Sequence, residues 1–101
     1  MTLQKMNAED VIQSLSTLPH WSVDATSSAI TREYVLVDFF NAFEFMTQIA
    51  VAAEKHDHHP DWRNVYNKVT IIWTTHDVQG LSTKDVNLAQ ICDEIYAGFD
   101  K

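Results

Sequence analysis

A long apolar stripe in the middle of the chain constrains the fold most, because it predicts a helix that separates two groups of strand-like segments. Apolar side chains recur there at spacings of three and four: Phe39, Ala42, Phe43, Met46, Ile49, Ala50 and Ala53. That period is typical of a helix with one buried face. Asp38 can cap its start. The helix must end before Pro60, because the residue preceding a proline avoids the helical region.

Strand-like segments come in pairs on either side of this helix. The first pair comprises a short segment at 21–23 and the alternating residues 30–37, joined by the small polar stretch 24–28. The second pair comprises residues 64–66 and 69–75, with Asn67 and Lys68 as the expected tight turn. In the last segment Val69, Ile71 and Trp73 share the expected core side, whereas Ile72 faces away and is a candidate subunit contact.

Two further helices flank these pairs. Asn7 can cap a helix that stops at Pro19, and Ser82 with Asp85 fits a capping box at the start of a C-terminal helix. The order α-β-β-α-β-β-α predicts an α+β fold, in which a four-stranded antiparallel sheet carries three helices on one face. We expect a single domain over residues 1–101, with the uncovered sheet face or the sheet edge available for self-association.

Composition excludes several classes of function. The formal net charge of −7 argues against nucleic acid and against anionic membranes as partners. No apolar run is long enough to span a bilayer, and residues 1–7 lack the apolar core of a secretory signal. The single cysteine, Cys92, cannot form an internal disulfide, and its apolar helical neighbours favour a buried, inert thiol. We therefore expect a soluble protein of a reducing compartment.

The chemistry is expected in a histidine cluster, because histidine can give and take protons near neutral pH. Four of the five histidines are gathered in one stretch: His56, His58, His59 and His76. His58 and His59 precede Pro60 in a loop, where they are either solvated turn residues or a proton donor and a group that orients a substrate. His76 is expected at a strand end, where it either faces water or meets the loop histidines in space.

Other residues near the cluster each have a structural alternative. Glu54 lies where its charge opposes the helix dipole, so it either supports the site or is simply exposed. Trp62 and Tyr66 either stack on a flat heteroaromatic ligand or pack in the core. Asp85 is explained first by the capping box. A zinc or copper site built from His58, His59 and His76 stays open, although the spacing matches no closed structural zinc pattern.

These motifs together resemble the pterin-4a-carbinolamine dehydratase family. The similarity lies in Glu-Lys-His-Asp-His-His-Pro-Asp-Trp at 54–62, Asn-Val-Tyr-Asn-Lys-Val at 64–69, Thr-His at 75–76, Gly-Leu-Ser at 80–82, and Asp85. The upstream Phe-Glu-Phe-Met at 43–46 is also similar. The resemblance runs from about residue 20 to the C-terminus.

The resemblance implies a hydro-lyase that dehydrates 4a-hydroxytetrahydrobiopterin to quinonoid dihydropterin without a metal or cofactor, in recycling of the tetrahydrobiopterin used by aromatic amino-acid hydroxylases. It implies that His58, His59 and His76 are the active-site histidines. We hypothesise that His58 and His76 transfer protons while His59 holds the pterin, and we leave open which is acid and which is base. The candidate substrate-binding residues are His59, Glu54, Trp62, Tyr66 and Asp85.

The resemblance also implies partners and a location. We expect a homodimer or a dimer of dimers in the cytoplasm, with no membrane and no direct nucleic-acid partner; coupling to a hydroxylase is left open. Animal relatives also serve as dimerisation cofactors of a homeodomain transcription factor, a role that would add a nuclear location. The alternatives are therefore a protein-binding cofactor without essential catalysis and a metal-binding protein.

Overall fold

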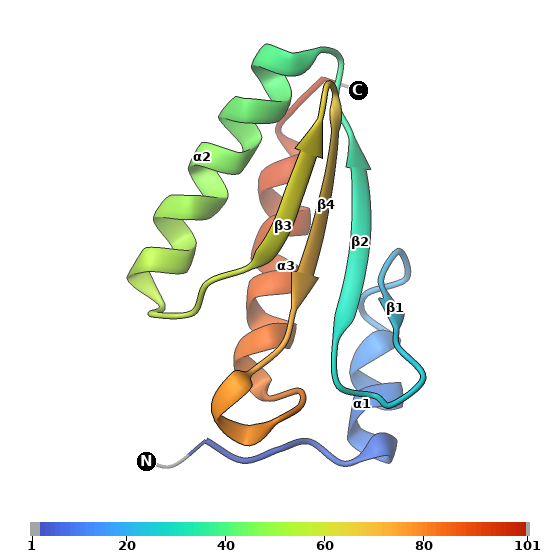
Figure 1. The fold of residues 1–101 in the computed structure, drawn as a ribbon. Coiled ribbons are helices and arrows are strands. Elements are labelled where there is room, and N and C mark those ends of the chain that lie inside the picture. Colours follow the sequence, from blue (N-terminus) through green and yellow to red (C-terminus); the bar gives the residue numbers. More distant parts are fainter. Residues whose placement is uncertain (1–2, 101) are drawn as a thin grey trace.

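The computed structural model describes residues 3–100 and has the predicted order of elements (Figure 1). Those elements are α1 (Ala8–Leu15), β1 (Ser22–Val23), β2 (Ile30–Val35), α2 (Phe39–Lys55), β3 (Asp61–Val65), β4 (Lys68–Trp73), the 3-10 turn η1 (His76–Val78) and α3 (Thr83–Ala97). The four strands form one antiparallel sheet in the order β1-β2-β4-β3. The predicted α+β class is thus confirmed.

Strand β4 is one of the two inner strands of the sheet, and its residues show the two faces. Val69, Ile71 and Trp73 are fully buried on the face that the helices cover, and Ile72 lies half-buried on the other face, as predicted. This alternation follows from the period of two in a strand. The pairing of Trp73 with Ile30 of β2 and of Ile71 with Trp62 of β3 fixes the register across the sheet.

The turn between β3 and β4 lies one residue earlier than predicted. Lys68 belongs to β4 and pairs with Val65, so Tyr66 and Asn67 form the turn, and Tyr66 has a left-handed φ of 54°. The Asn64 side-chain amide explains the shift, because it donates to the carbonyl oxygens of Tyr66 and Lys68 at 2.9 Å each. Such local side-chain bonds stabilise a tight turn.

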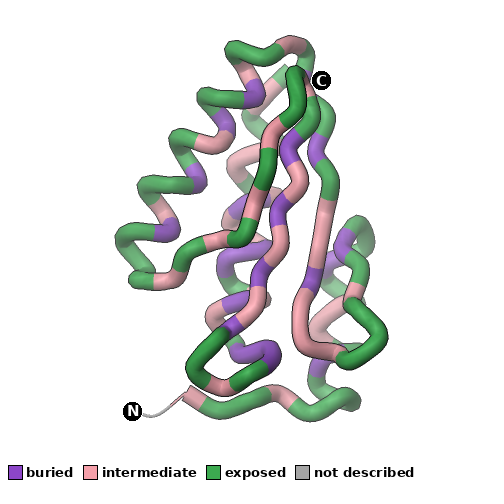
Figure 2. The backbone as a smooth tube through the Cα atoms, viewed as in Figure 1, coloured by how far each residue is buried: buried purple, intermediate pink, exposed green. Residues whose placement is uncertain are grey.

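The buried face of α2 also differs from the predicted stripe. Ala42, Ile49 and Ala53 are buried as expected, but Phe45 is the aromatic residue in the core, whereas Phe43 is 58% exposed. Phe45 packs between two aromatic rings: Tyr34 of β2, at a centroid distance of 4.7 Å, and Phe99 near the C-terminus, at 5.8 Å. The helix therefore carries apolar residues on two faces, and Figure 2 shows that only one of them is buried.

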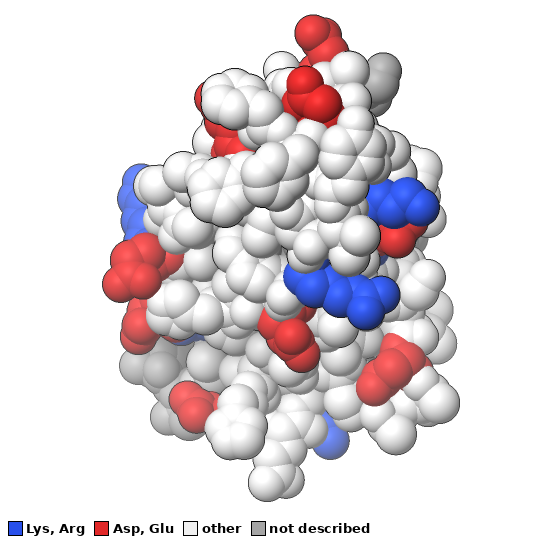
Figure 3. Space-filling model, turned by 45° about the horizontal axis from the view of Figure 1, so that its top comes forward, with Lys and Arg blue, Asp and Glu red and all other residues white. Residues whose placement is uncertain are grey.

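The two ends of the molecule have different surfaces. Large exposed apolar side chains gather where β2 ends, β3 turns into β4 and α2 begins: Val35, Val37, Phe39, Phe40, Phe43, Val65 and Tyr66. The opposite end holds η1 and the end of α2 (Figure 1). On the face displayed in Figure 3, Lys and Arg side chains are scattered among acidic groups and form no single basic field. Among the described residues, no helix has the length and apolar character required to cross a membrane.

Candidate active site

His58 is placed by the way α2 ends. The helix stops at Lys55, Asp57 takes a left-handed φ of 51°, and the His58 amide donates back to the Ala53 carbonyl at 3.0 Å. This reversal directs the imidazole toward the sheet, where it stacks on Trp73 with ring centroids 5.6 Å apart and an interplanar angle of 16°. The side chain of His58 is only 11% exposed, so it is held in one orientation.

A buried carboxylate lies behind His58. Nε2 of His58 is 2.6 Å from Oδ1 of Asp85, which is fully buried. The other oxygen, Oδ2, accepts from the Ser82 amide at 2.9 Å and from the Thr75 hydroxyl at 2.6 Å. The predicted capping box at Ser82 is confirmed. Asp85 is buried and does not line the pocket, and its contact with substrate stays a prediction.

The direction of these hydrogen bonds assigns the roles of the two His58 nitrogens. The Thr75 hydroxyl proton goes to Asp85, so in the 2.7 Å contact between Thr75 and Ser82 the Ser82 hydroxyl must be the donor, while its oxygen accepts from the Lys84 amide. Donors thus converge on the Asp85 carboxylate, which is acceptor-only when ionised. His58 then donates from Nε2, and in the neutral ring Nδ1 carries the free lone pair.

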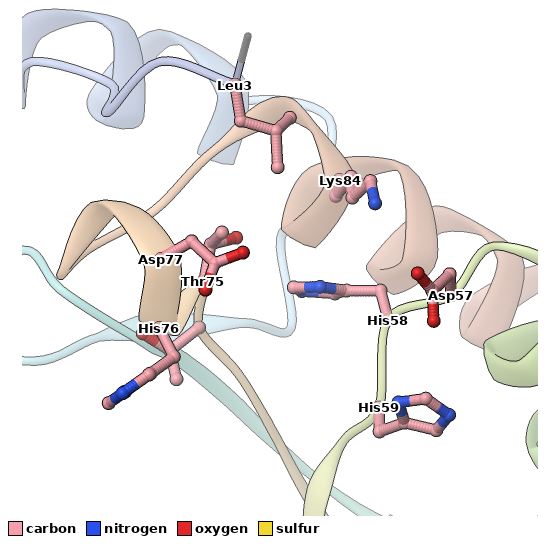
Figure 4. A pocket seen from close by; sticks show the side chains of 9 residues that line it. Leu3, Asp57, His58, His59, Thr75, His76, Asp77 and Lys84 are labelled. Atoms are coloured by element: carbon pink, nitrogen blue, oxygen red, sulfur yellow. The ribbon is translucent and has the colours of Figure 1, made fainter.

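The three candidate histidines line one open pocket of about 290 Å³. The lining residues are Leu3, Asp57, His58, His59, Thr74, Thr75, His76, Asp77 and Lys84. His76 reaches it from η1, a short turn closed by the bridge between Thr75 and Gly80. In Figure 4 the His58 ring points toward η1, whereas the rings of His59 and His76 turn outward. Both outer histidines are exposed, so their side chains can change rotamer on a nanosecond scale.

Glu54 is paired with His59 at the rim rather than inside the pocket. Oε2 of Glu54 lies 3.0 Å from Nε2 of His59, and the two side chains are 82% and 61% exposed. Glu54 does not line the pocket. A surface pair of this kind adds little stability, so its effect is to bias the orientation of the His59 ring.

The structure does not bring the two predicted stacking residues to this pocket. Trp62 is half-buried and packs against the core, and Tyr66 is 65% exposed in the turn at the far end of the sheet. The aromatic surface beside His58 comes instead from Trp73. The β4 pattern predicted Trp73 as a core residue, and nothing in its spacing indicated that it would also support a histidine.

Other lining residues were not proposed as site residues from the sequence. Thr75 precedes His76, and Lys84 follows the capping serine, so their proximity to the site follows from the ends of β4 and α3. Leu3 reaches the pocket from the N-terminal segment, whose residues show no helical or strand period. Within residues 3–100, no group of three or more His, Cys, Asp or Glu side chains is arranged to hold a metal ion.

A second carboxylate on α3, Asp93, fastens the helix to the sheet away from the pocket. It accepts from the Trp21 indole at 3.1 Å, from Nη1 of Arg32 at 2.7 Å and from the Tyr34 hydroxyl. Burial, and next the bond to Asp93, raise the pKa of Tyr34 well above its ordinary value near 10, so the hydroxyl stays protonated. This network is structural and provides a natural control for Asp85.

Comparison with known proteins finds relatives that match this chain over nearly its whole length. A protein of Rhizorhabdus wittichii is 44% identical over 95 residues, covering 94% of this chain and 98% of the relative, and one of Mesorhizobium japonicum is 40% identical over 98 residues, covering 97% and 100%. Both are named for pterin-4-alpha-carbinolamine dehydratase, and both names mark the activity as not yet demonstrated.

A solved structure supports the fold as well. The crystal structure titled "transcriptional coactivator/pterin dehydratase" from Brucella melitensis superposes with a TM-score of 0.89 at 35% identity, covering 92% of this chain and 99% of that one. The family profile described as pterin 4 alpha carbinolamine dehydratase matches residues 4–95, which include the pocket histidines, Thr75 and the buried Asp85. By sequence and by fold, this chain belongs to the pterin 4 alpha carbinolamine dehydratase family.

Proposed function

We propose that this protein catalyses the loss of water from 4a-hydroxytetrahydropterins by histidine acid–base chemistry. The observation that carries the proposal is that His58, His59 and His76 line one pocket and that a buried carboxylate fixes the tautomer of His58. The pocket volume of about 290 Å³ lies at the lower end of the range for small-molecule sites. The pocket is open to solvent, so that the product can leave.

The reaction needs one proton donor and one proton acceptor. The C4a–O bond breaks as the leaving hydroxyl receives a proton, N5–H loses its proton, and the C4a=N5 bond forms with release of water. We assign the base to His58, because its Nδ1 has a free lone pair while Nε2–H is bonded to Asp85. We assign the acid to His76, which is exposed and can be reprotonated by solvent. Each group would contribute about 10²–10⁴-fold.

His59 has a different role in this proposal. Its pairing with Glu54 biases the orientation of the ring at the rim, so it would position the pterin rather than transfer a proton. Loss of His59 should therefore raise KM more than it lowers kcat.

The physiological setting of the proposed reaction would be recycling of tetrahydrobiopterin in the cytoplasm.

A dehydration assay with freshly generated 4a-hydroxytetrahydropterin tests the proposal. The wild type should accelerate the disappearance of the carbinolamine, and His58→Ala combined with His76→Ala should lose nearly all of that acceleration. His56→Ala is the matched control, because His56 is exposed in the same loop but does not line the pocket. A double variant that keeps most of the activity would show that the histidines do not carry the chemistry.

We also propose that the chain associates with copies of itself. The exposed apolar residues at the end opposite the pocket, Phe39 and Phe40 among them, form a surface that a monomer would leave in water. Light scattering should report a dimer or tetramer, and Phe40→Asp should shift it toward smaller species. A monomeric wild type at micromolar concentration would contradict this part of the proposal.

A further inference from the structure

Residues 3–7, which we term the N-terminal arm, are tied to the loop between η1 and α3. The Met6 amide donates to the Leu81 carbonyl at 2.7 Å, and Leu81 is buried directly before the capping Ser82. The side chain of Lys5 packs over Gly80 so closely that a Cβ at Gly80 would lie 2.7 Å from Lys5 Cε. The arm is therefore anchored to the same loop that joins His76 to the helix of Asp85.

This anchoring brings Leu3 into the histidine pocket. Leu3 is half-buried and lines the pocket together with Lys84 and Asp77 (Figure 4). The other lining residues carry imidazole, carboxylate, hydroxyl or ammonium groups, so Leu3 supplies the only aliphatic side chain among the described residues of the lining. In Figure 4 it lies on the far side of His58 from His59.

The chemistry of the substrate indicates what this side chain would contact. The inference rests on the proposed function: a tetrahydropterin has a pyrimidine edge with N–H and C=O groups and a reduced ring whose C6 and C7 are saturated carbons. Leucine cannot pair with the polar edge, and burying N–H or C=O groups against it would leave them unsatisfied. The polar lining can serve those groups, which leaves the carbon edge for Leu3.

We infer that Leu3 is a specificity-determining residue, which packs against the saturated C6–C7 edge of the pterin and the substituent on C6. The N-terminal arm thereby completes the substrate site. Because Leu3 carries no proton to transfer, its contribution is binding of the substrate and not the chemical step. It should therefore affect KM and leave kcat largely unchanged.

The test compares Leu3→Ala with Leu3→Met in the full chain. Leu3→Ala should raise KM for the 6-methyl carbinolamine about 3–10-fold with kcat within about twofold. This is below the roughly 10–200-fold effect of a methylene in an enclosed hydrophobic pocket, because this site is open to solvent. Leu3→Met, which keeps apolar volume, should restore most of the affinity. Ile12→Ala, an apolar truncation at a side chain 69% exposed on α1, should leave KM unchanged.

An equilibrium measurement separates this inference from the proposed function. Tetrahydropterin with and without a 6-methyl group, kept under nitrogen, lacks the 4a-hydroxyl and cannot react. Leu3→Ala should weaken binding of the 6-methyl compound more than binding of the unsubstituted one. If Leu3→Ala shows this selective loss of binding but the wild type catalyses no dehydration, the proposed activity is overturned and the role of Leu3 is supported. An active wild type whose KM and pterin affinity are unchanged by Leu3→Ala would overturn the role of Leu3.

Discussion

Asp85→Asn is the perturbation that tests the site most directly, because it changes the acceptor behind His58 without changing its size. The amide oxygen can replace Oδ2 and keep the bonds from Ser82 and Thr75, which places the amide nitrogen opposite His58 Nε2. That nitrogen donates and cannot accept. His58 must then accept at Nε2 and carry its proton on Nδ1, so the atom assigned as the base loses its lone pair.

The expected cost in stability follows from the three hydrogen bonds. Bonds to a charged group contribute about 1.5–3 kcal/mol each, and neutral ones roughly half as much. Replacing three charge-assisted bonds by neutral ones should therefore lower the free energy of unfolding by about 2–4.5 kcal/mol, or roughly 10–35 °C in Tm for a domain of this size. Activity should fall by about 10²–10⁴-fold, the usual contribution of a general base.

Three measurements check this prediction together: thermal unfolding, the dehydration rate below Tm, and long-range ¹H–¹⁵N spectra that identify the protonated nitrogen of His58. Asp93→Asn is the matched control, because Asp93 lies on the same helix and also accepts three donors, but away from the pocket. It should lower Tm while leaving the tautomer and the rate unchanged. If Asp85→Asn lowers Tm but preserves both the tautomer and the rate, Asp85 only caps α3 and the assignment of His58 is wrong.

Three further predictions concern the rest of the molecule. Phe45→Ala should lower the free energy of unfolding by about 3–5 kcal/mol, whereas Phe43→Ala should cost under about 1 kcal/mol, because only Phe45 is buried; equal costs in chemical denaturation would contradict the observed face of α2. Burial raises the pKa of the Cys92 thiol to about 12, so a disulfide reagent at pH 8 should modify the native protein far more slowly than the protein unfolded in guanidinium, and equal rates would refute the burial. Since burial raises the pKa of Tyr34, its contribution to stability should be complete below pH 10 and decline as pH rises further, which denaturant titrations of wild type and Tyr34→Phe would detect as a steeper alkaline loss in the wild type.

The fold could be predicted from the sequence because its signals are local and repeated. Alternation in residues 69–73 and the caps at Asn7, Asp38 and Ser82 gave the element order, and all three caps are present. The choice of face on α2 could not be predicted in the same way. Apolar residues at 39 and 43 are spaced like those at 45 and 49, and only the position of Tyr34 on β2 decides which set is buried.

The site could be predicted in its residue types but not in its connections. The histidines drew attention because of their pKa range, and the pocket does bring His58, His59 and His76 together. A capping box, however, is enough to explain an aspartate at position 85. The sequence therefore did not indicate that the second carboxylate oxygen would bond to His58. Leu3 was beyond prediction for a related reason: an isolated apolar residue ahead of a helix has no periodicity, and only the bond from Met6 to Leu81 shows where it lies.

The shared use of Asp85 explains why a pocket on loops can hold His58 in one orientation. One carboxylate oxygen accepts from the Ser82 amide at the start of α3 and from the Thr75 hydroxyl just beyond β4. The other oxygen accepts from His58 in the loop after α2. Three segments far apart in the sequence are thus joined at one buried group. Shifting the start of α3 would move Asp85 and with it His58, so the site geometry is set by the helix cap and the sheet. Among the described residues, the side chains of His59, Glu54 and His76 at the rim form no hydrogen bond to a buried group. These three side chains can therefore adjust to a ligand.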